Sequence, residues 1–170
     1  MFKRFWILLF IVTFIAHNAY AYEQFGGVEE NIYGYEFKYG DEARFQKNAD
    51  AFMLKWETTK DPKLKQVYLN EAMRYYFLLS KINKDNIRAQ IGLGKIYDEM
   101  KLDKFAKQHF NHAYNIDSKN PELNYKFGDF YFKRKDLFNA HQYFDRAYKN
   151  GYKNNYDLNL KMSKLYAQLA

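Results

Sequence analysis

The sequence predicts an all-α protein assembled from paired helices, and two observations carry this prediction. The first is composition, because the 170 residues include only three Val, three Thr and two Pro, whereas strands and their turns need β-branched residues punctuated by Gly and Pro. The second is a sequence repeat of 34 residues in the C-terminal half, a period typical of stacked helix–turn–helix units.

Charge and cysteine content narrow the functional classes. The chain carries 27 Lys and Arg against 20 Asp and Glu, for a formal net charge of +7, and it has no Cys. A disulfide, a thiolate nucleophile and a Cys-ligated metal are therefore excluded. Lys, Tyr and Phe are all abundant, but AT-rich codon usage explains this excess, so it says little about partners.

Residues 1–21 are predicted to be a secretory signal peptide. Two basic residues precede an apolar run of 12 residues over 5–16, and Ala19 and Ala21 offer a small-x-small cleavage site that places the mature start near Tyr22. The alternative is an uncleaved membrane anchor, but this run falls short of the ~20 apolar residues that a spanning helix needs. Export without Cys favours the periplasm of a Gram-negative bacterium over a disulfide-rich extracellular setting.

Residues 22–40 are predicted to form an extended arm. Four aromatic residues stand at every second position, which places one row of rings on one face of an extended segment. The arm could pair with a sheet edge of a partner or fold back over the first helix pair. The second alternative is favoured, because exposed aromatic rows promote aggregation. The candidate contact residues are Tyr33, Tyr35, Phe37 and Tyr39.

Apolar periodicity and helix-start signals place seven helices after the arm. The first has an apolar stripe at helical spacing that runs from Phe45 to Trp56. Later starts are marked by Asn120 with Pro121 and by Asp136, since Asn and Asp cap helix N-termini and Pro suits the first helical position. The expected ranges are 41–58, 62–82, 86–99, 103–116, 121–133, 137–149 and 155–169.

Two units of the repeat, 87–120 and 121–154, align at fixed positions. Each first helix has a Leu-Gly or Phe-Gly pair followed by Tyr, and each second helix has Ala, Phe and Ala. The small residues let two helix backbones approach closely, and the large ones fill the space between successive pairs. The matched positions are Leu93, Gly94 and Tyr97 with Phe127, Gly128 and Tyr131, and Ala106, Phe110 and Ala113 with Ala140, Phe144 and Ala147.

The pattern extends beyond these two units in weaker form. Ala72 and Tyr76 occupy second-helix positions one period earlier. If one residue is inserted near Gly151, Met162-Ser163-x-x-Tyr166 repeats the first-helix pattern at the C-terminus. The asparagines that recur at the period are Asn86, Asn120 and Asn154.

These positions resemble the tetratricopeptide repeat (TPR) family, whose 34-residue unit has Leu-Gly and Tyr in its first helix and Ala, an aromatic residue and Ala in its second. The resemblance covers about residues 60–170 of a predicted helical domain, 41–170. It implies a short right-handed α-solenoid of about three antiparallel helix pairs plus a C-terminal helix, in which each pair buries its apolar face against its neighbours.

The resemblance also implies a binding surface, because the first helices of this family line a concave groove that binds peptides. Some members hold a C-terminal carboxylate there with a Lys/Asn/Arg clamp, which Ile91 with Lys95 and Tyr125 with Asp129 do not reproduce. A partner helix or extended segment is expected instead, with Tyr125 and Phe132 as exposed anchors; ordinary exposed residues are the alternative. Carried over by position, the set is Arg88, Ile91, Lys95, Asp98, Glu122, Tyr125, Asp129, Phe132 and Lys133.

The sequence predicts no catalytic, cofactor or metal site. It holds neither a Gly-x-Ser-x-Gly elbow, nor a phosphate loop, nor a His-Glu-x-x-His pair. His109 and His112 stand three residues apart, with His141 on the next second helix, but no carboxylate completes a metal set, which favours helix-surface histidines. Scattered lysines and export argue against nucleic acid, whereas a weak contact with an anionic membrane surface is left open.

The sequence thus predicts a non-catalytic periplasmic scaffold for protein–protein interaction, a component of a larger cell-envelope assembly. Motility or secretion machinery is a host by analogy alone. The alternative is a periplasmic chaperone-like or peptidoglycan-machinery adaptor that binds client peptides in the groove, and an unrecognised enzyme is the third hypothesis. Other envelope proteins are the expected partners; their identity and the oligomeric state of the chain stay open.

Overall fold

A computed structural model describes residue 38 and residues 40–169 of the chain. The predicted signal peptide and the aromatic residues Tyr33, Tyr35, Phe37 and Tyr39 of the predicted arm lie outside the described residues. The described part consists of helices joined by turns and contains no strand, so the prediction of an all-α protein is confirmed.

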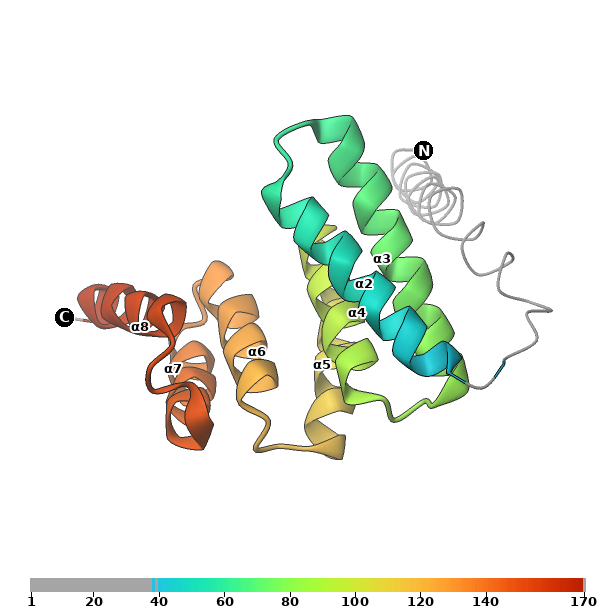
Figure 1. The fold of residues 1–170 in the computed structure, drawn as a ribbon. Coiled ribbons are helices and arrows are strands. Elements are labelled where there is room, and N and C mark those ends of the chain that lie inside the picture. Colours follow the sequence, from blue (N-terminus) through green and yellow to red (C-terminus); the bar gives the residue numbers. More distant parts are fainter. Residues whose placement is uncertain (1–37, 39, 170) are drawn as a thin grey trace, which may run out of the picture. The chain divides into compact units, whose positions relative to one another are not determined.

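The helices follow one another as α2 to α8, with one wide turn of π-helix (Figure 1). The expected ranges agree with the observed ones to within two residues at every end. The largest difference is in α7, which ends at Ala147 because the chain widens into the π-turn, where Gly151 has a φ of 127°. The bounds are α2 Asp41–Thr58, α3 Pro62–Ile82, α4 Ile87–Glu99, α5 Asp103–Ile116, α6 Pro121–Lys133, α7 Leu137–Ala147, η1 Tyr148–Tyr152 and α8 Tyr156–Leu169.

The chain divides within α3 into two compact units, one ending at Leu78 and one beginning at Leu79. In the N-terminal unit α2 and α3 form a pair, and aromatic rings fill the space between them. The rings of Phe52 and Tyr75 stack with their centroids 5.9 Å apart, and the Tyr76 hydroxyl donates to Asp50 at 3.3 Å. The predicted α2 stripe is therefore the packing face of this helix.

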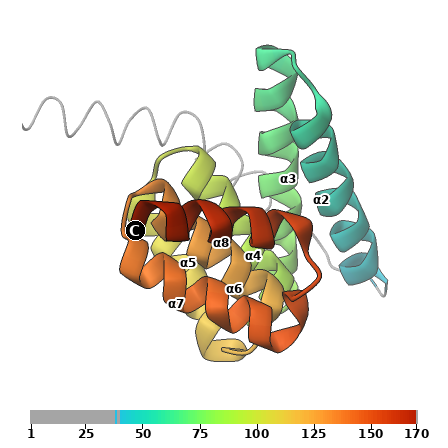
Figure 2. The same ribbon diagram turned by 90° about the vertical axis from the view of Figure 1, so that its left-hand side faces the viewer.

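The C-terminal unit contains two further pairs, α4 with α5 and α6 with α7, followed by α8 (Figure 1). Helix α6 contacts both α4 and α5, and α8 contacts both α6 and α7. Figure 2 shows α8 running across this part of the unit. Each first helix after α4 therefore packs on the preceding pair.

The closest approach within each pair is made at a glycine. A Cβ atom built on Gly94 would lie 2.8 Å from the Phe110 ring, and one built on Gly128 would lie 2.5 Å from the Phe144 ring. Both rings are buried. The two pairs thus repeat one contact at a spacing of 34 residues. The sequence predicts close approach at the two glycines, but it assigns the two rings to the space between successive pairs.

The helix ends repeat as well. The side chains of Asn86 and Asn120 accept hydrogen bonds from backbone N–H groups three residues on, at 2.9 and 3.0 Å, which caps α4 and α6. The third cap is Asn155, at 2.9 Å, not Asn154, because the inserted residue near Gly151 shifts the register by one. In the C-terminal unit the repeat is therefore one of local geometry as well as of residue type.

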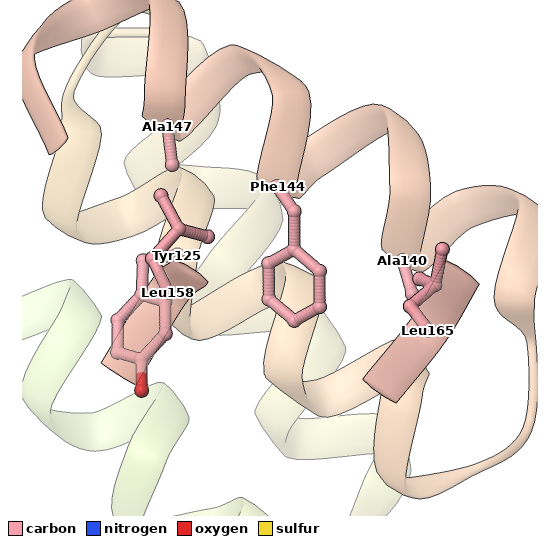
Figure 3. Close-up of a cluster of buried hydrophobic side chains, with 6 residues drawn as sticks. All are labelled: Tyr125, Ala140, Phe144, Ala147, Leu158 and Leu165. Carbon is pink, nitrogen blue, oxygen red and sulfur yellow. The ribbon is translucent and has the colours of Figure 1, made fainter. Parts of the chain in front are cut away.

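The core below α8 draws on three helices. Figure 3 shows Tyr125 of α6, the Phe144 ring of α7 and leucines of α8 gathered in one cluster. Tyr131, Phe132, Tyr152 and Met162 pack against its edge. The cluster consists of Tyr125, Ala140, Phe144, Ala147, Leu158 and Leu165.

Candidate functional site

The predicted groove residues all lie on α4 and α6, the first helices of the two repeat units. The structure brings three of them, Asp98, Asp129 and Lys133, into one ion-pair network. It places three others, Ile91, Tyr125 and Phe132, largely inside the protein. Arg88, Lys95 and Glu122 complete the predicted set on these two helices.

The network is centred on Lys133. Its Nζ atom lies 2.8 Å from Asp98 Oδ2, 2.8 Å from Glu99 Oε1 and 3.6 Å from Asp129 Oδ2. Lys161 of α8 pairs with the other oxygen of Asp129. The carboxylates and ammonium groups thus alternate across the three first helices α4, α6 and α8.

Arg134 extends the network toward α5. Its guanidinium lies 2.7 Å from Asp98 Oδ1, pairs also with Asp103, and sits 3.7 Å above the Phe130 ring. Asp98 is only 4 % exposed, and two cations compensate its buried charge. We call this set the charge ladder: Asp98, Glu99, Asp103, Asp129, Lys133, Arg134 and Lys161.

The electrostatics of the ladder favour its charged form. Burial lowers the pKa of Lys133, but hydrogen bonds to Asp98 and Glu99 and the charge of Asp129 outweigh this effect and hold its pKa above the ordinary value. The hydrogen bond from Arg134 lowers the pKa of Asp103. Lys133 and Asp103 are therefore ionised near neutral pH.

The expectation that Tyr125 and Phe132 are exposed anchors is wrong. Tyr125 is 8 % exposed, and its ring lies 6.2 Å from Phe144 and 6.1 Å from Tyr152. The Phe132 ring lies 6.1 Å from Phe144 on the other side. The Tyr125 ring is buried and the Phe132 ring is partly buried, because α7 and α8 cover the face of α6 that carries them. Whether the remaining predicted groove residues bind a partner stays a prediction.

Arg88 and Glu122 lie near one end of the same face. Burial raises the pKa of the Tyr152 hydroxyl, the Glu122 carboxylate raises it further, and the Arg88 guanidinium lowers it. The three groups therefore interact electrostatically, although they come from α4, α6 and the turn after α7. Lys95 lies about two turns further along α4 and is partly exposed.

The histidines are held by separate partners. The Gln90 side chain donates to the Lys84 carbonyl, so its oxygen accepts from Nδ1 of His109 at 2.7 Å. The His109 ring also stacks on Tyr97, with centroids 5.3 Å apart. His112 lies 2.9 Å from Asp85. Among the described residues no group of three or more His, Cys, Asp or Glu is placed to hold a metal ion.

Acidification is expected to destabilise the C-terminal unit through His109. Burial, helped by His112, lowers its pKa from 6.5 to about 4. Between these two pH values His109 binds a proton in the unfolded chain but not in the folded chain. The free energy of unfolding therefore decreases by about 2–3 kcal/mol as the pH is lowered from 6.5 to about 4. Urea denaturation at pH 7.5 and 4.5 measures the loss.

His109→Gln is the matched variant for this experiment, because it retains a donor for Gln90 but does not titrate. We expect a clearly smaller pH dependence in that variant, whereas His141→Gln should behave as the parent. Equal pH dependence in the parent and His109→Gln would contradict the assignment.

Sequence reasoning missed part of the ladder. Arg134, Asp103 and Lys161 were not among the predicted groove residues. Arg134 pairs with Asp103 and Lys161 pairs with Asp129, in each case about one repeat period away in the sequence. Residues one period apart face each other on successive repeat units, so this spacing is a signal for the two pairs.

No protein-family model matches this chain, and no curated protein matches it as a relative. The fold alone therefore defines the class, an all-helical protein with repeat-like helix pairs. In the part of the chain that the structure describes, no helix has both the length and the apolar character needed to cross a membrane.

Proposed function

We propose that this protein is a non-catalytic interaction module, a short right-handed solenoid of TPR-like helix pairs, that serves as a periplasmic scaffold in a cell-envelope assembly. One observation carries the proposal. The contact of Gly94 with Phe110 recurs at Gly128 with Phe144, so successive pairs present equivalent surfaces. Proteins built this way use such extended surfaces to bind other proteins.

The first-helix face is the surface that we propose for partner binding. It is polar, with the charge ladder at one end and Arg88, Lys95 and Glu122 along the rest of it. The ladder charges are mutually paired. Arg88 is exposed and Lys95 is partly exposed, which makes an acidic segment of the partner the best match.

The periplasmic location rests on residues 1–21 and on the absence of Cys. The basic start, the apolar run and the small residues before Tyr22 support it. A scaffold in this compartment has other envelope proteins as partners. Membership of motility or secretion machinery is an analogy to other exported repeat proteins.

Affinity capture of the mature protein from its own envelope, after cross-linking, tests the proposal. The variant Arg88→Glu with Lys95→Glu reverses two charges on α4. Its control, Lys104→Glu with Lys107→Glu, makes the same charge change on α5 of the same unit. We expect one stoichiometric partner, retained by the control and lost with the α4 variant.

Two other outcomes count against the scaffold. Many substoichiometric clients would favour the chaperone-like or peptidoglycan-machinery adaptor. A single partner captured equally well by the α4 variant would place the interface elsewhere on the protein. Circular dichroism of both variants checks that the helix content is unchanged.

A further inference from the structure

Helix α8 is the structural equivalent of α6, displaced by 35 residues. Its cap at Asn155 corresponds to Asn120. The Asn124 side chain donates to the carbonyl six residues before it, and Asn159 does the same. Leu158 is buried below α8 as Leu123 is on α6. These agreements fix which residue of α8 corresponds to which residue of α6.

Four residues of α6 are covered by the second helix of their own pair, α7. Tyr125 and Phe132 flank the Phe144 ring, and Gly128 lies beneath that ring. Tyr131 stacks on Tyr143 of α7, with centroids 5.6 Å apart. This row of four residues on α6 is therefore the surface against which the second helix of the pair packs.

The equivalent row on α8 is open. It consists of Leu160, Ser163, Tyr166 and Ala167, and all four are exposed, Leu160 at 40 % and Tyr166 at 47 %. Tyr166 contacts His141 of the preceding pair. In the described part of the chain α8 buries its inner face, through Leu158 and Leu165, and leaves this outer row uncovered.

Helix α8 is the last helix that the structure describes, and its outer row carries exposed apolar side chains at the positions where α6 packs against α7. Tyr156 and Leu169 add further exposed apolar area on the same helix. Exposed apolar surface of this kind marks interaction sites.

We propose that the outer row of α8 docks an amphipathic helix of a partner protein, which packs as α5 packs on α4 and α7 on α6. The inference rests on the proposed function and adds a second contact surface, besides the first-helix face, together with the kind of partner segment that fits it. The template for the partner is the Ala-x-x-x-Phe-x-x-Ala pattern of both second helices. Small residues at its two ends let the helices approach closely.

The side chain of Ser163 determines which residue fits at the centre of the partner helix. At Gly94 and Gly128 an added Cβ would lie within 2.8 Å of a phenylalanine ring, and Ser163 carries that Cβ. Its hydroxyl is turned back to its own helix, where it donates to the Asn159 carbonyl at 2.9 Å. A leucine therefore fits the central position better than the phenylalanine of the template.

Charge favours a different protein over a second copy of this chain. The exposed lysines Lys153 and Lys164 flank the row, and the chain as a whole has a net charge of +7. Two copies would bring like charges together, whereas a helix with acidic flanks would pair with these lysines.

The experiment fuses a helix to the chain so that it can cover the outer row of α8. The full chain is extended after Ala170 by a flexible Gly/Ser linker and a copy of residues 136–150 in which the counterpart of Phe144 is leucine. The control extension has aspartate at that position. We expect α8 amides to exchange about tenfold more slowly with the leucine helix than with the aspartate helix. Equal exchange in both fusions overturns the proposal.

Two further measurements separate this proposal from its alternatives. If the unextended chain sediments as a dimer that Leu160→Asp dissociates, a second copy covers the row and the proposal is wrong. In the envelope capture described above, Leu160→Asp should lose the partner while it keeps its helix content. Capture that survives Leu160→Asp overturns this inference and leaves the proposed function standing; capture of no partner by the parent protein overturns both.

Discussion

Replacing Gly128 with leucine is expected to lower the free energy of unfolding of the C-terminal unit by about 3 kcal/mol. The first side-chain atom alone would lie 2.5 Å from the Phe144 ring. That ring cannot move aside, because Tyr125 and Phe132 pack on either side of it. Helices α6 and α7 must therefore separate. Native-state hydrogen exchange of the amides in α6 and α7 reports the loss for this unit.

The matched control is Ser163→Leu, the equivalent position on α8. No second helix covers that position among the described residues, so the change should stay within about 0.5 kcal/mol. If Gly128→Leu is as stable as the parent protein, the contact between α6 and α7 is wrong and the repeat register falls with it.

Truncating Tyr125 to alanine is expected to cost about 3 kcal/mol or more, at the level of other buried aromatic residues. The ring joins the cluster formed by α6, α7 and α8, where it packs near Phe144 and Tyr152. Its removal opens a cavity beneath α8, because Leu158 and Leu165 are fixed by the helix that carries them. Urea denaturation followed by far-UV circular dichroism measures the cost.

Tyr156→Ala is the control, since Tyr156 is 77 % exposed. We expect its effect to stay within about 0.5 kcal/mol. A stable Tyr125→Ala variant that no longer captures the partner would restore Tyr125 as a binding anchor and contradict the burial described above.

The helices of this protein could be predicted from the sequence because their signals are local. Apolar spacing acts within a few residues, and so do the helix-start signals at Asn120 with Pro121 and at Asp136. The observed N-terminal ends of α6 and α7 follow these signals. The close approach of the helices at Gly94 and Gly128 could also be predicted, because the repeat places a glycine at the same position of both first helices.

The burial of Tyr125 and Phe132 could not be predicted from one helix. Their seven-residue spacing places both on one stripe of α6, but spacing does not say whether that stripe faces water or another helix. The answer depends on α8, which lies about one period further along the chain and covers the cluster. The same dependence hid the pairing of Lys161 with Asp129.

The most direct test of the repeated architecture is a pair of double-mutant cycles, one in each helix pair of the C-terminal unit. The first combines Gly94→Ala with Phe110→Leu, and the second combines Gly128→Ala with Phe144→Leu. In each cycle the smaller leucine side chain should relieve the overpacking that the alanine causes, so both coupling energies should have the same sign and a size of about 1 kcal/mol. Coupling in only one helix pair, or in neither, would contradict the claim that the two pairs share one packing geometry.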